Sequence, residues 1–302
     1  MLDRLSLDQL RTFVAAVEEG SFSAAGRKLH RSQSVVSELV SALERQLRVT
    51  IFDRSGRYPT LTEAGHVLLA DARSILAGVE GMKARADGMA SGVEPELSVA
   101  IDVLFPMAAV TAAAKDFQRQ FPKTPLRVHA ETLGGAYQPV LDGRARLGIV
   151  GPLPIEFPSV ASERLAAISM VTVAARDHPL AAIQGVIPRR ELAAHTQIVL
   201  TDRSNLSRGR EFGVMSPLSW RLADLFAKHA FLLSGLGFGG MPLHVVDRDL
   251  AEGRLVRLQI EDVPEDGLVL PMSAIYLKAT PPGPAGRWLI ERLGQYPSGN
   301  PI

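Results

Sequence analysis

The chain has 302 residues, of which 46% are hydrophobic and 22% charged, and its 33 basic and 32 acidic side chains leave a net charge of +1. This composition is typical of a soluble globular protein of two or three domains and excludes a disordered chain. The absence of cysteine excludes disulfides, thiolate nucleophiles and cysteine-ligated metal centres.

The first fifty residues predict three helices. Apolar residues recur at helical spacing through residues 7–17, with Ser6 as a plausible N-cap and Gly20 as a stop. Ser23 is placed to cap a short second helix. The third helix is expected to bury a stripe made of Val36, Val40, Leu43 and Leu47. The second and third helices form a helix-turn-helix unit, which the first helix completes as a small core.

The third helix begins in the stretch RSQSVVSELV, residues 31–40. We expect its valines and Leu39 to face inward. The side chains expected to point outward are Ser34, Ser37, Glu38, Ser41 and Glu44. Between residues 27 and 57, seven basic side chains accompany three acidic ones, an excess of four positive charges. This excess is either a footprint for DNA phosphates or a solvated charged face.

Residues 51–61, IFDRSGRYPTL, predict a small β-hairpin beside the helices. Apolar ends flank a polar tip that contains Gly56 and Pro59, and the tip carries Arg54 and Arg57. Such a hairpin is the wing of a winged helix-turn-helix.

A long helix is expected from Thr62, a good N-cap, to about residue 90. Its apolar residues follow a heptad seam: Leu68, Ala72, Ile75, Val79, Met82, Ala86 and Met89. Three glycines each weaken this helix by about 1 kcal/mol, so an isolated copy would be marginal. The seam therefore indicates dimerisation, with an intrachain core helix as the alternative.

Residues 92–96 predict a linker, after which strands alternate with helices. The first set has strands at 97–102, 126–132 and 147–151, with helices at 107–120 and 136–142. The second set has strands at 169–176, 197–200 and 268–279, with helices near 188–195, 218–234, 242–251 and 285–294. This order predicts two α/β subdomains with parallel strands and a ligand-binding cleft between them.

Three stretches resemble the LysR-type transcriptional regulators of bacteria. The family's helix-turn-helix is similar to LDQLRTFVAAVEEGSFSAAGRKLHRSQSVVSELVSALERQL. Its wing and the start of its linker helix are similar to IFDRSGRYPTLTEAG. A glycine-rich turn common in its C-terminal domain is similar to LLSGLGFGGMP. The resemblance implies a mixed α+β and α/β fold in three parts. These are a winged helix-turn-helix over residues 1–61, a dimerisation helix over 62–91, and an effector-binding domain like periplasmic binding proteins over 92–302. In that domain, subdomain I covers about 96–163 and 266–302, and subdomain II about 164–265.

DNA contacts are expected from the recognition helix and from the wing. The residues concerned are Ser32, Gln33, Ser34, Ser37 and Glu38 in the helix, and Arg54 and Arg57 in the wing. Gln33 can pair with an adenine edge, and Ser32 with the helix amides can hold a phosphate. Glu38 departs from the family pattern, which often has a basic or amide residue there. A carboxylate could accept a hydrogen bond from cytosine instead.

Effector contacts are expected from loops at the carboxyl ends of strands. The candidates are Asp102, Val103, Leu104 and Phe105, then Thr132, Leu133, Gly134 and Gly135, and, across the cleft, Thr201, Asp202 and Arg203. Many family members hold an effector carboxylate with serine or threonine hydroxyls at the first two of these places, and this chain departs from that pattern. Glycine amides can still bind an anion, and Phe105 suggests an apolar wall. With Arg203 or Arg208 as a clamp, the hypothesis is a small organic or aromatic acid.

Other classes of function find less support in the sequence. GLGFGG, residues 235–240, does not follow a predicted strand as a dinucleotide-binding loop would, so we expect a helix end at Gly235 and a turn. No histidine pair has metal-ligand spacing and no serine lies in a GxSxG motif. We expect no enzyme, no metal and no cofactor besides the effector. The alternative is a cytoplasmic solute-binding protein without DNA function.

The expected partners are promoter DNA and further copies of the chain, as a homodimer through the linker helix and as a homotetramer. RNA polymerase is an additional candidate. The N-terminus shows no signal peptide and no apolar run reaches 18 residues, so we expect a cytoplasmic protein with no membrane association.

Overall fold

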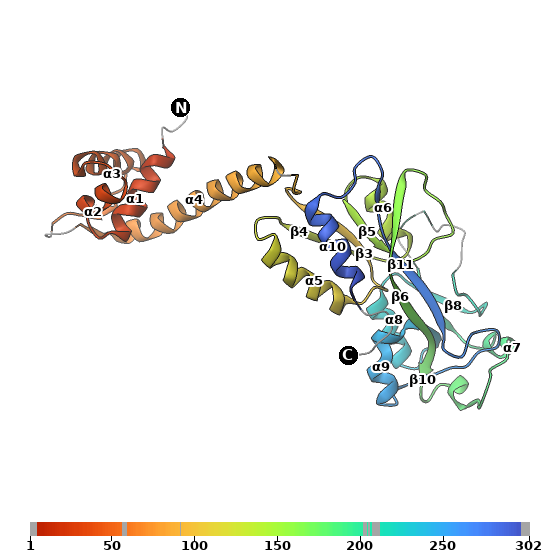
Figure 1. The fold of residues 1–302 in the computed structure, drawn as a ribbon. Coiled ribbons are helices and arrows are strands. Elements are labelled where there is room, and N and C mark those ends of the chain that lie inside the picture. The colour runs from red at the N-terminus through yellow and green to blue at the C-terminus, as the bar shows by residue number, and fades with distance from the viewer. Residues whose placement is uncertain are drawn as a thin grey trace. The chain divides into compact units, whose positions relative to one another are not determined.

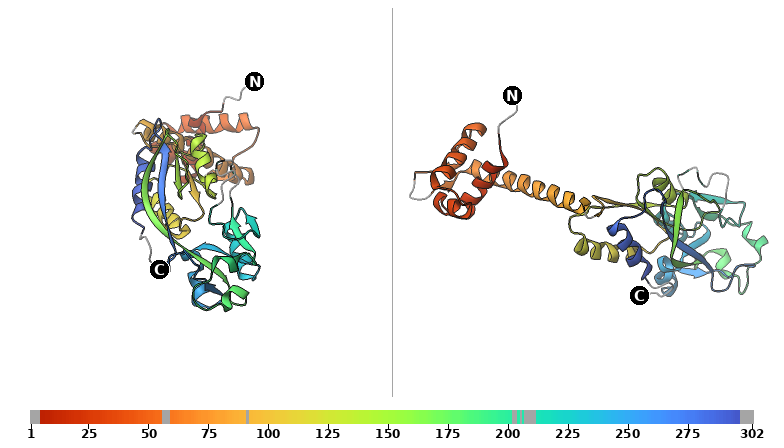
Figure 2. Two further views of the ribbon diagram at one scale, coloured as in Figure 1. Left: turned by 90° about the vertical axis from the view of Figure 1, so that its right-hand side faces the viewer. Right: turned by 45° about the horizontal axis from the view of Figure 1, so that its top comes forward.

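A computed structural model describes residues 5–55, 59–90, 92–201, 204, 206 and 212–296. The chain divides near residue 87 into two compact units. The first is helical, and the second contains a large sheet (Figures 1 and 2). Each unit is described by itself below.

The N-terminal unit is built from three helices and a hairpin. The elements are α1 (Leu7–Glu18), α2 (Phe22–Lys28), α3 (Gln33–Leu47), β1 (Phe52–Asp53) and β2 (Thr60–Leu61). The expected cap at Ser6 is confirmed, and Ser6 forms a capping box with Gln9. The expected cap at Ser23 is wrong. Ser21 has the extended backbone that a cap needs and its hydroxyl accepts from the Ala24 amide, so the helix starts earlier.

The buried stripe of α3 packs into this unit's core. Val36, Val40 and Leu43 are fully buried, as expected, while Leu47 is partly buried. The rings of Phe13 and Phe22 each meet Phe52 of β1 edge-on, with centroids 5.8 and 5.2 Å apart. The expectation for Val35 is wrong, because this side chain is 40% exposed. Adjacent helical residues differ by about 100° in direction, so Val35 cannot share the side of Val36.

The long helix α4 (Glu63–Ala90) has 28 residues. The Thr62 hydroxyl caps it by accepting from the Gly65 amide at 3.0 Å. At its start, Leu69 and Ala72 are buried in the core of the helix-turn-helix. Further along, Ile75 is 48% and Met82 60% exposed. These two members of the seam are therefore largely uncovered within one chain.

The C-terminal unit contains, in its described part, a nine-stranded sheet. Its strands are β3 (Leu97–Asp102), β4 (Leu126–Glu131), β5 (Leu147–Val150), β6 (Val160–Ala175), β7 (Gln197–Leu200), β8 (Ser219–Leu222), β9 (Phe238–Pro242), β10 (Leu255–Arg257) and β11 (Leu268–Leu277). Their order is β4-β3-β5-β11-β6-β9-β7-β8, and β10 pairs with β6. The parallel groups β4-β3-β5 and β9-β7-β8 form the two halves of the expected fold.

Helices cover both faces of each half. They are α5 (Met107–Gln120), α6 (Gly134–Leu141), α7 (Arg189–Leu192), α8 (Leu225–Leu233), α9 (Leu243–Ala251), α10 (Pro284–Gly294) and a 3-10 turn at Pro179–Ala182. Side chains alternate along β3, so Val99 and Ile101 pack with α5 and α10, whereas Ala100 packs with α6. In the second half, the side chains of the strands likewise pack into two clusters, one on each face of the sheet.

Two antiparallel strands, β6 and β11, connect the halves (Figure 1). β6 has 16 residues, and its first part pairs with β11 while its last part pairs with β9 and β10. The pairing of β6 with β11 shifts between Met272 and Ser273, which face Ala166 and Arg164 and leave Leu165 as the extra residue. Only the second half of β6 was expected from the sequence, as a strand over residues 169–176.

Two further strands were assigned incorrectly from the sequence. Residues 219–222, expected as the start of a helix, form β8 at the edge of the sheet, and α8 begins only after the cap at Asp224. Gly235 does follow the end of α8, with φ +71°, as the helix end expected there. The predicted turn after it is short, because residues 238–242 form β9.

Glu94, in the linker that follows α4, is buried against the start of α10. Its side-chain oxygens accept from the amides of Ala285 and Gly286, each at 3.0 Å. A side chain at Gly286 would place a Cβ atom 2.8 Å from this carboxylate, so the contact needs glycine there. Farther along α10, Arg287 pairs with Glu163 of β6 at 2.6 Å. The linker is therefore fixed to a helix that also holds a connecting strand.

Candidate functional site

The start of α3 presents a row of short polar side chains. Ser32 caps the helix by accepting from the Val35 amide at 3.4 Å, and its hydroxyl lies 2.8 Å from that of Ser34. Gln33, Ser34 and Glu38 are exposed, while Ser37 is half-buried. Within the described residues, the side chains of Gln33 and Glu38 form no hydrogen bond or ion pair. This end of the helix is therefore free to meet another molecule.

The wing is attached to α3 through Glu44. One oxygen of this carboxylate accepts from the amides of Ile51 and Phe52 at 2.8 and 3.1 Å, and the other pairs with Arg54 at 2.8 Å. The expectation that Glu44 points outward is wrong, since its side chain is only 16% exposed. The start of β1 supplies two amide donors that need an acceptor at that position.

Arg54 lies along the side of α3 rather than free on the wing. Its guanidinium contacts the Ser41 hydroxyl at 3.2 Å and stands 5.4 Å from the centre of the Phe22 ring. The side chain is still 41% exposed, so one side of the guanidinium faces solvent. Arg57 lies outside the described residues.

Other basic residues of this region also have acidic neighbours. Arg31 pairs with Asp8 at 2.7 Å and lowers the pKa of that carboxyl group, while Lys28 pairs with Glu18 and Glu19. Part of the local positive charge is thus balanced by α1.

The first effector loop, after β3, is mostly a packing element. Asp102 is fully buried, and one of its oxygens accepts from the Leu104 amide at 3.0 Å. Leu104 packs in the core of the second half, whereas Phe105 packs in the core of the first. These two side chains therefore connect the loop to the cores of both halves.

The second loop contacts the far side of the cleft directly. The Thr132 hydroxyl donates to the Thr201 carbonyl at 3.0 Å and so bridges the two halves. Leu133 has a positive φ of 48°, and Gly134 and Gly135 are buried in the first turn of α6. The Gly135 amide already donates to the Thr132 carbonyl at 2.9 Å. Asp202 and Arg203 lie outside the described residues.

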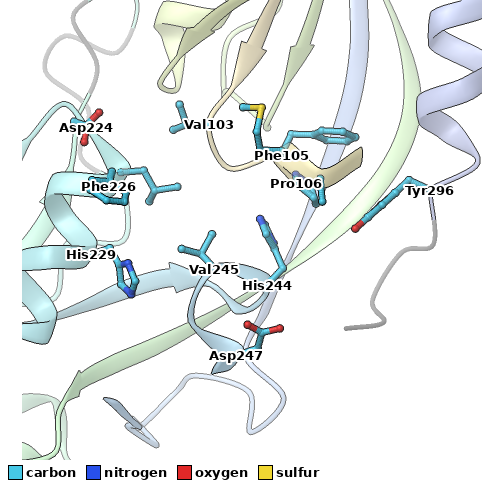
Figure 3. Close-up of a pocket in the computed structure, with 13 residues that line it drawn as sticks. Val103, Phe105, Pro106, Asp224, Phe226, His229, His244, Val245, Asp247 and Tyr296 are labelled. Carbon is cyan, nitrogen blue, oxygen red and sulfur yellow. The ribbon is translucent and has the colours of Figure 1, made fainter. Parts of the chain in front are cut away.

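A cavity of about 560 Å³ opens between the halves beside these loops (Figure 3). The starts of α5, α8 and α9 surround it, together with Tyr296, the second residue after α10. Its lining residues are Val103, Phe105, Pro106, Met107, Ala108, Asp224, Leu225, Phe226, His229, His244, Val245, Asp247 and Tyr296. Only Val103 and Phe105 were named from the sequence. His244, Val245 and Asp247 were missed because β9 was not recognised, so the start of α9 was not placed at this edge of the sheet.

Most of the cavity wall is apolar, and its charged groups are acidic. Asp224 and Asp247 line it, and the described lining contains no lysine or arginine. Burial lowers the pKa of His244, which favours its neutral form near pH 7. His229 is held by Asp249 at 2.7 Å, and Asp249 also pairs with Arg254. Such a cavity suits an apolar, uncharged molecule better than an anion.

The described residues offer neither a metal centre nor a membrane span. No group of three or more histidine or acidic side chains among them is placed to hold a metal ion. Likewise, no helix in that part of the chain is long and apolar enough to cross a bilayer.

Comparison with known proteins gives matches over nearly the whole chain. Residues 7–66 match the family described as "Bacterial regulatory helix-turn-helix protein, lysR family", and residues 90–297 match "LysR substrate binding domain". The transcriptional regulator PunR of Escherichia coli is 30% identical over 291 residues, which are 93% of this chain and 90% of PunR. The uncharacterised regulator YeeY of the same organism is 29% identical over 257 residues, 84% of this chain and 83% of YeeY.

A solved structure extends the likeness to three dimensions. A mutant of OxyR from Corynebacterium glutamicum matches with a TM-score of 0.62 and 24% identity, over 97% of this chain and 93% of that one. At this level of identity, the match supports the fold.

Proposed function

The chain belongs to the LysR family of DNA-binding transcriptional regulators, and we propose that it reads DNA with the start of α3 under the control of a small molecule bound between the halves of its C-terminal unit. The predictions of a regulator with an effector-binding domain and of this mixed fold are confirmed by that membership. The family is one of regulators rather than enzymes. The alternative of a solute-binding protein without DNA function is set aside, because residues 7–66 match the regulatory helix-turn-helix.

The proposed DNA contacts rest on the exposure of the polar side chains at the start of α3. Short side chains at Ser32 and Ser34 let the helix backbone approach base edges, and Gln33 can donate to and accept from adenine. Glu38 lies one turn further on and can only accept when ionised, so we assign it to a cytosine or adenine amino group. Ser37 belongs to the same surface. Arg54, held by Glu44, offers its free side to a phosphate, and we assign Arg57 the same role.

Gln33→Ala is expected to weaken binding to a preferred duplex by about tenfold to 100-fold, the loss of one bidentate base contact, while binding to random DNA stays unchanged. Arg54→Ala should weaken binding to the preferred duplex and to random DNA alike, and it should lower the number of counterions released on binding by about one. Fluorescence anisotropy titrations across salt concentrations measure these effects. Arg119→Ala, in the C-terminal unit, is the control. If Gln33→Ala and Arg54→Ala both bind as wild type does, α3 and the wing are not the DNA-binding surface.

We assign effector binding to the cavity of Figure 3 and the adjoining cleft. The hydrogen bond from Thr132 to Thr201 supports this assignment. A ligand that enters the cleft would compete for the Thr132 hydroxyl and the Thr201 carbonyl. Of the residues expected from the sequence, Val103 and Phe105 line the cavity, and we assign the neighbouring Asp102, Leu104, Leu133, Gly134, Gly135, Asp202 and Arg203 to the adjoining loops of the cleft. The acidic rim argues for an uncharged apolar effector over the organic acid suggested by the sequence.

A matched pair of small probes separates these two effector classes. Benzamide is expected to raise the melting temperature of the full-length protein at millimolar concentration more than benzoate does, because Asp224 and Asp247 repel a carboxylate. Val245→Trp, which fills the cavity, should abolish the shift and leave DNA binding intact. A larger shift with benzoate would restore the acid hypothesis, and a shift that survives in Val245→Trp would move the site elsewhere.

We further infer the division of labour and the assembly. Residues 1–61 bind DNA, 62–91 dimerise, and 92–302 bind the effector, within subdomains of about 96–163 with 266–302 and 164–265. The exposed seam residues Ile75 and Met82 of α4 support dimerisation. A homotetramer acting on promoter DNA in the cytoplasm, with RNA polymerase as a further partner, is the proposed working form.

A further inference from the structure

Two neighbouring valines at the start of α3 have opposite surroundings. Val36 is fully buried in the core of the N-terminal unit, whereas the side chain of Val35 is 40% exposed. Val35 does not belong to the apolar cluster of this unit, nor to the partly buried residues packed against it. Its backbone amide is held by the Ser32 cap, which fixes the direction of its Cα–Cβ bond.

The stability of the helix gives no reason for a valine at this place. β-Branched residues lose side-chain freedom in helices, so an exposed valine destabilises α3 relative to alanine by a few tenths of a kcal/mol. A buried valine would offset this by packing in the core, but Val35 lies outside the core cluster of this unit. The residue is therefore better explained by a contact outside the chain.

The neighbours of Val35 define the kind of surface that it would contact. Gln33, Ser34 and Glu38 are all exposed around it. Val35 is thus the apolar group within a polar surface at the helix start. On the major-groove edge of a base pair, the matching apolar group is the 5-methyl of thymine, which is the only methyl group among the four unmodified bases.

We propose that Val35 recognises a thymine methyl group, beside the base read by Gln33, and so adds an A·T preference to each half-site. This inference rests on the proposed DNA-binding role of α3. Gln33 and Val35 are two residues apart, about 200° around the helix, so they flank its first turn on opposite sides. They therefore contact different bases, and the contribution of Val35 is separable from that of Gln33.

Replacing single thymines by uracil tests the contact, because uracil keeps the pairing and loses only the methyl group. The probe is a duplex selected from random sequence by the full-length wild-type protein. At one thymine in each half-site, uracil is expected to weaken wild-type binding by about fourfold to tenfold. Val35→Ala should bind the unmodified duplex more weakly by a similar factor and be insensitive to uracil at that position.

Two controls keep the result specific. Val35→Thr keeps one methyl group and should retain part of the uracil sensitivity, whereas Gln33→Ala should keep all of it. Thermal melting of each variant checks that α3 is folded. If Val35→Ala shows the same uracil sensitivity as wild type at every thymine, or if wild type shows none, the proposal is wrong while DNA binding by α3 stands. If selection yields no preferred duplex, it is the proposed DNA-binding role that fails.

Discussion

Replacing both Ile75 and Met82 of α4 by glutamate is expected to convert the full-length protein to monomers and to weaken its binding to a two-half-site DNA by about 100-fold or more. These side chains are 48% and 60% exposed within one chain and lie seven residues apart on the seam. Two charges per chain on a shared apolar seam would have to be desolvated in the dimer. Sedimentation equilibrium measures the mass, and anisotropy measures the DNA binding.

Val67→Glu is the matched control for that variant. Val67 is an exposed apolar residue of the same helix, at 62%, but it lies off the seam. It should leave both the mass and the DNA affinity unchanged. A double variant that remains dimeric would show that α4 is not the dimerisation helix, and the uncovered seam would need another partner.

Glu94→Ala is expected to lower the free energy of unfolding of the C-terminal unit by about 3 kcal/mol. The substitution leaves the amides of Ala285 and Gly286 without their acceptor at the start of α10, where a negative charge is also favoured by the helix dipole. Both tryptophans of the chain, Trp220 and Trp288, lie in this unit. Urea titration followed by tryptophan fluorescence therefore reports on it selectively.

Two further variants show whether the charge and the geometry both matter. Glu94→Gln keeps one carbonyl oxygen and should lose about half as much stability. Glu96→Ala removes an exposed carboxylate that pairs with Arg127 at the surface, and should change stability by less than about 0.5 kcal/mol. Equal effects of Glu94→Ala and Glu96→Ala would mean that the buried contact adds nothing.

The sequence predicted those elements whose signals are local. The cap at Ser6 and the buried stripe of α3 follow from spacing alone, as do the parallel strands with apolar runs. It failed at β8 and β9. Residues 218–222, LSWRL, do alternate between apolar and polar, but this run is short and its apolar members Leu218 and Trp220 are exposed at the sheet edge, while the glycines of β9 resemble a turn. A strand of this kind exists because its neighbours pair with it, and that pairing is not visible in one stretch of sequence.

In the candidate sites too, features with a local signal could be predicted and features that depend on another element could not. The exposed start of α3 was predictable, because a helix has only one side for its apolar residues. The roles of Glu44 and Glu94 were not, since each carboxylate accepts from amides brought to it by another element. Phe226 shows a further limit. It lines the cavity although it is 82% exposed, and nothing in its own segment marks it as part of a site.

The shift in pairing between β6 and β11 determines how the crevice can open. The two strands form one continuous ribbon through both halves, so the halves cannot swing apart on slack loops. A hydrogen-bonded ribbon bends and twists most readily where its ladder is interrupted, here at Leu165 opposite Met272 and Ser273. The halves should therefore rock by a small angle about this point. Arg164 and Glu163 directly precede Leu165, and Glu163 pairs with Arg287 of α10, so the rotation would be transmitted to α10. Because α10 also binds Glu94, a rotation of the halves should move the linker.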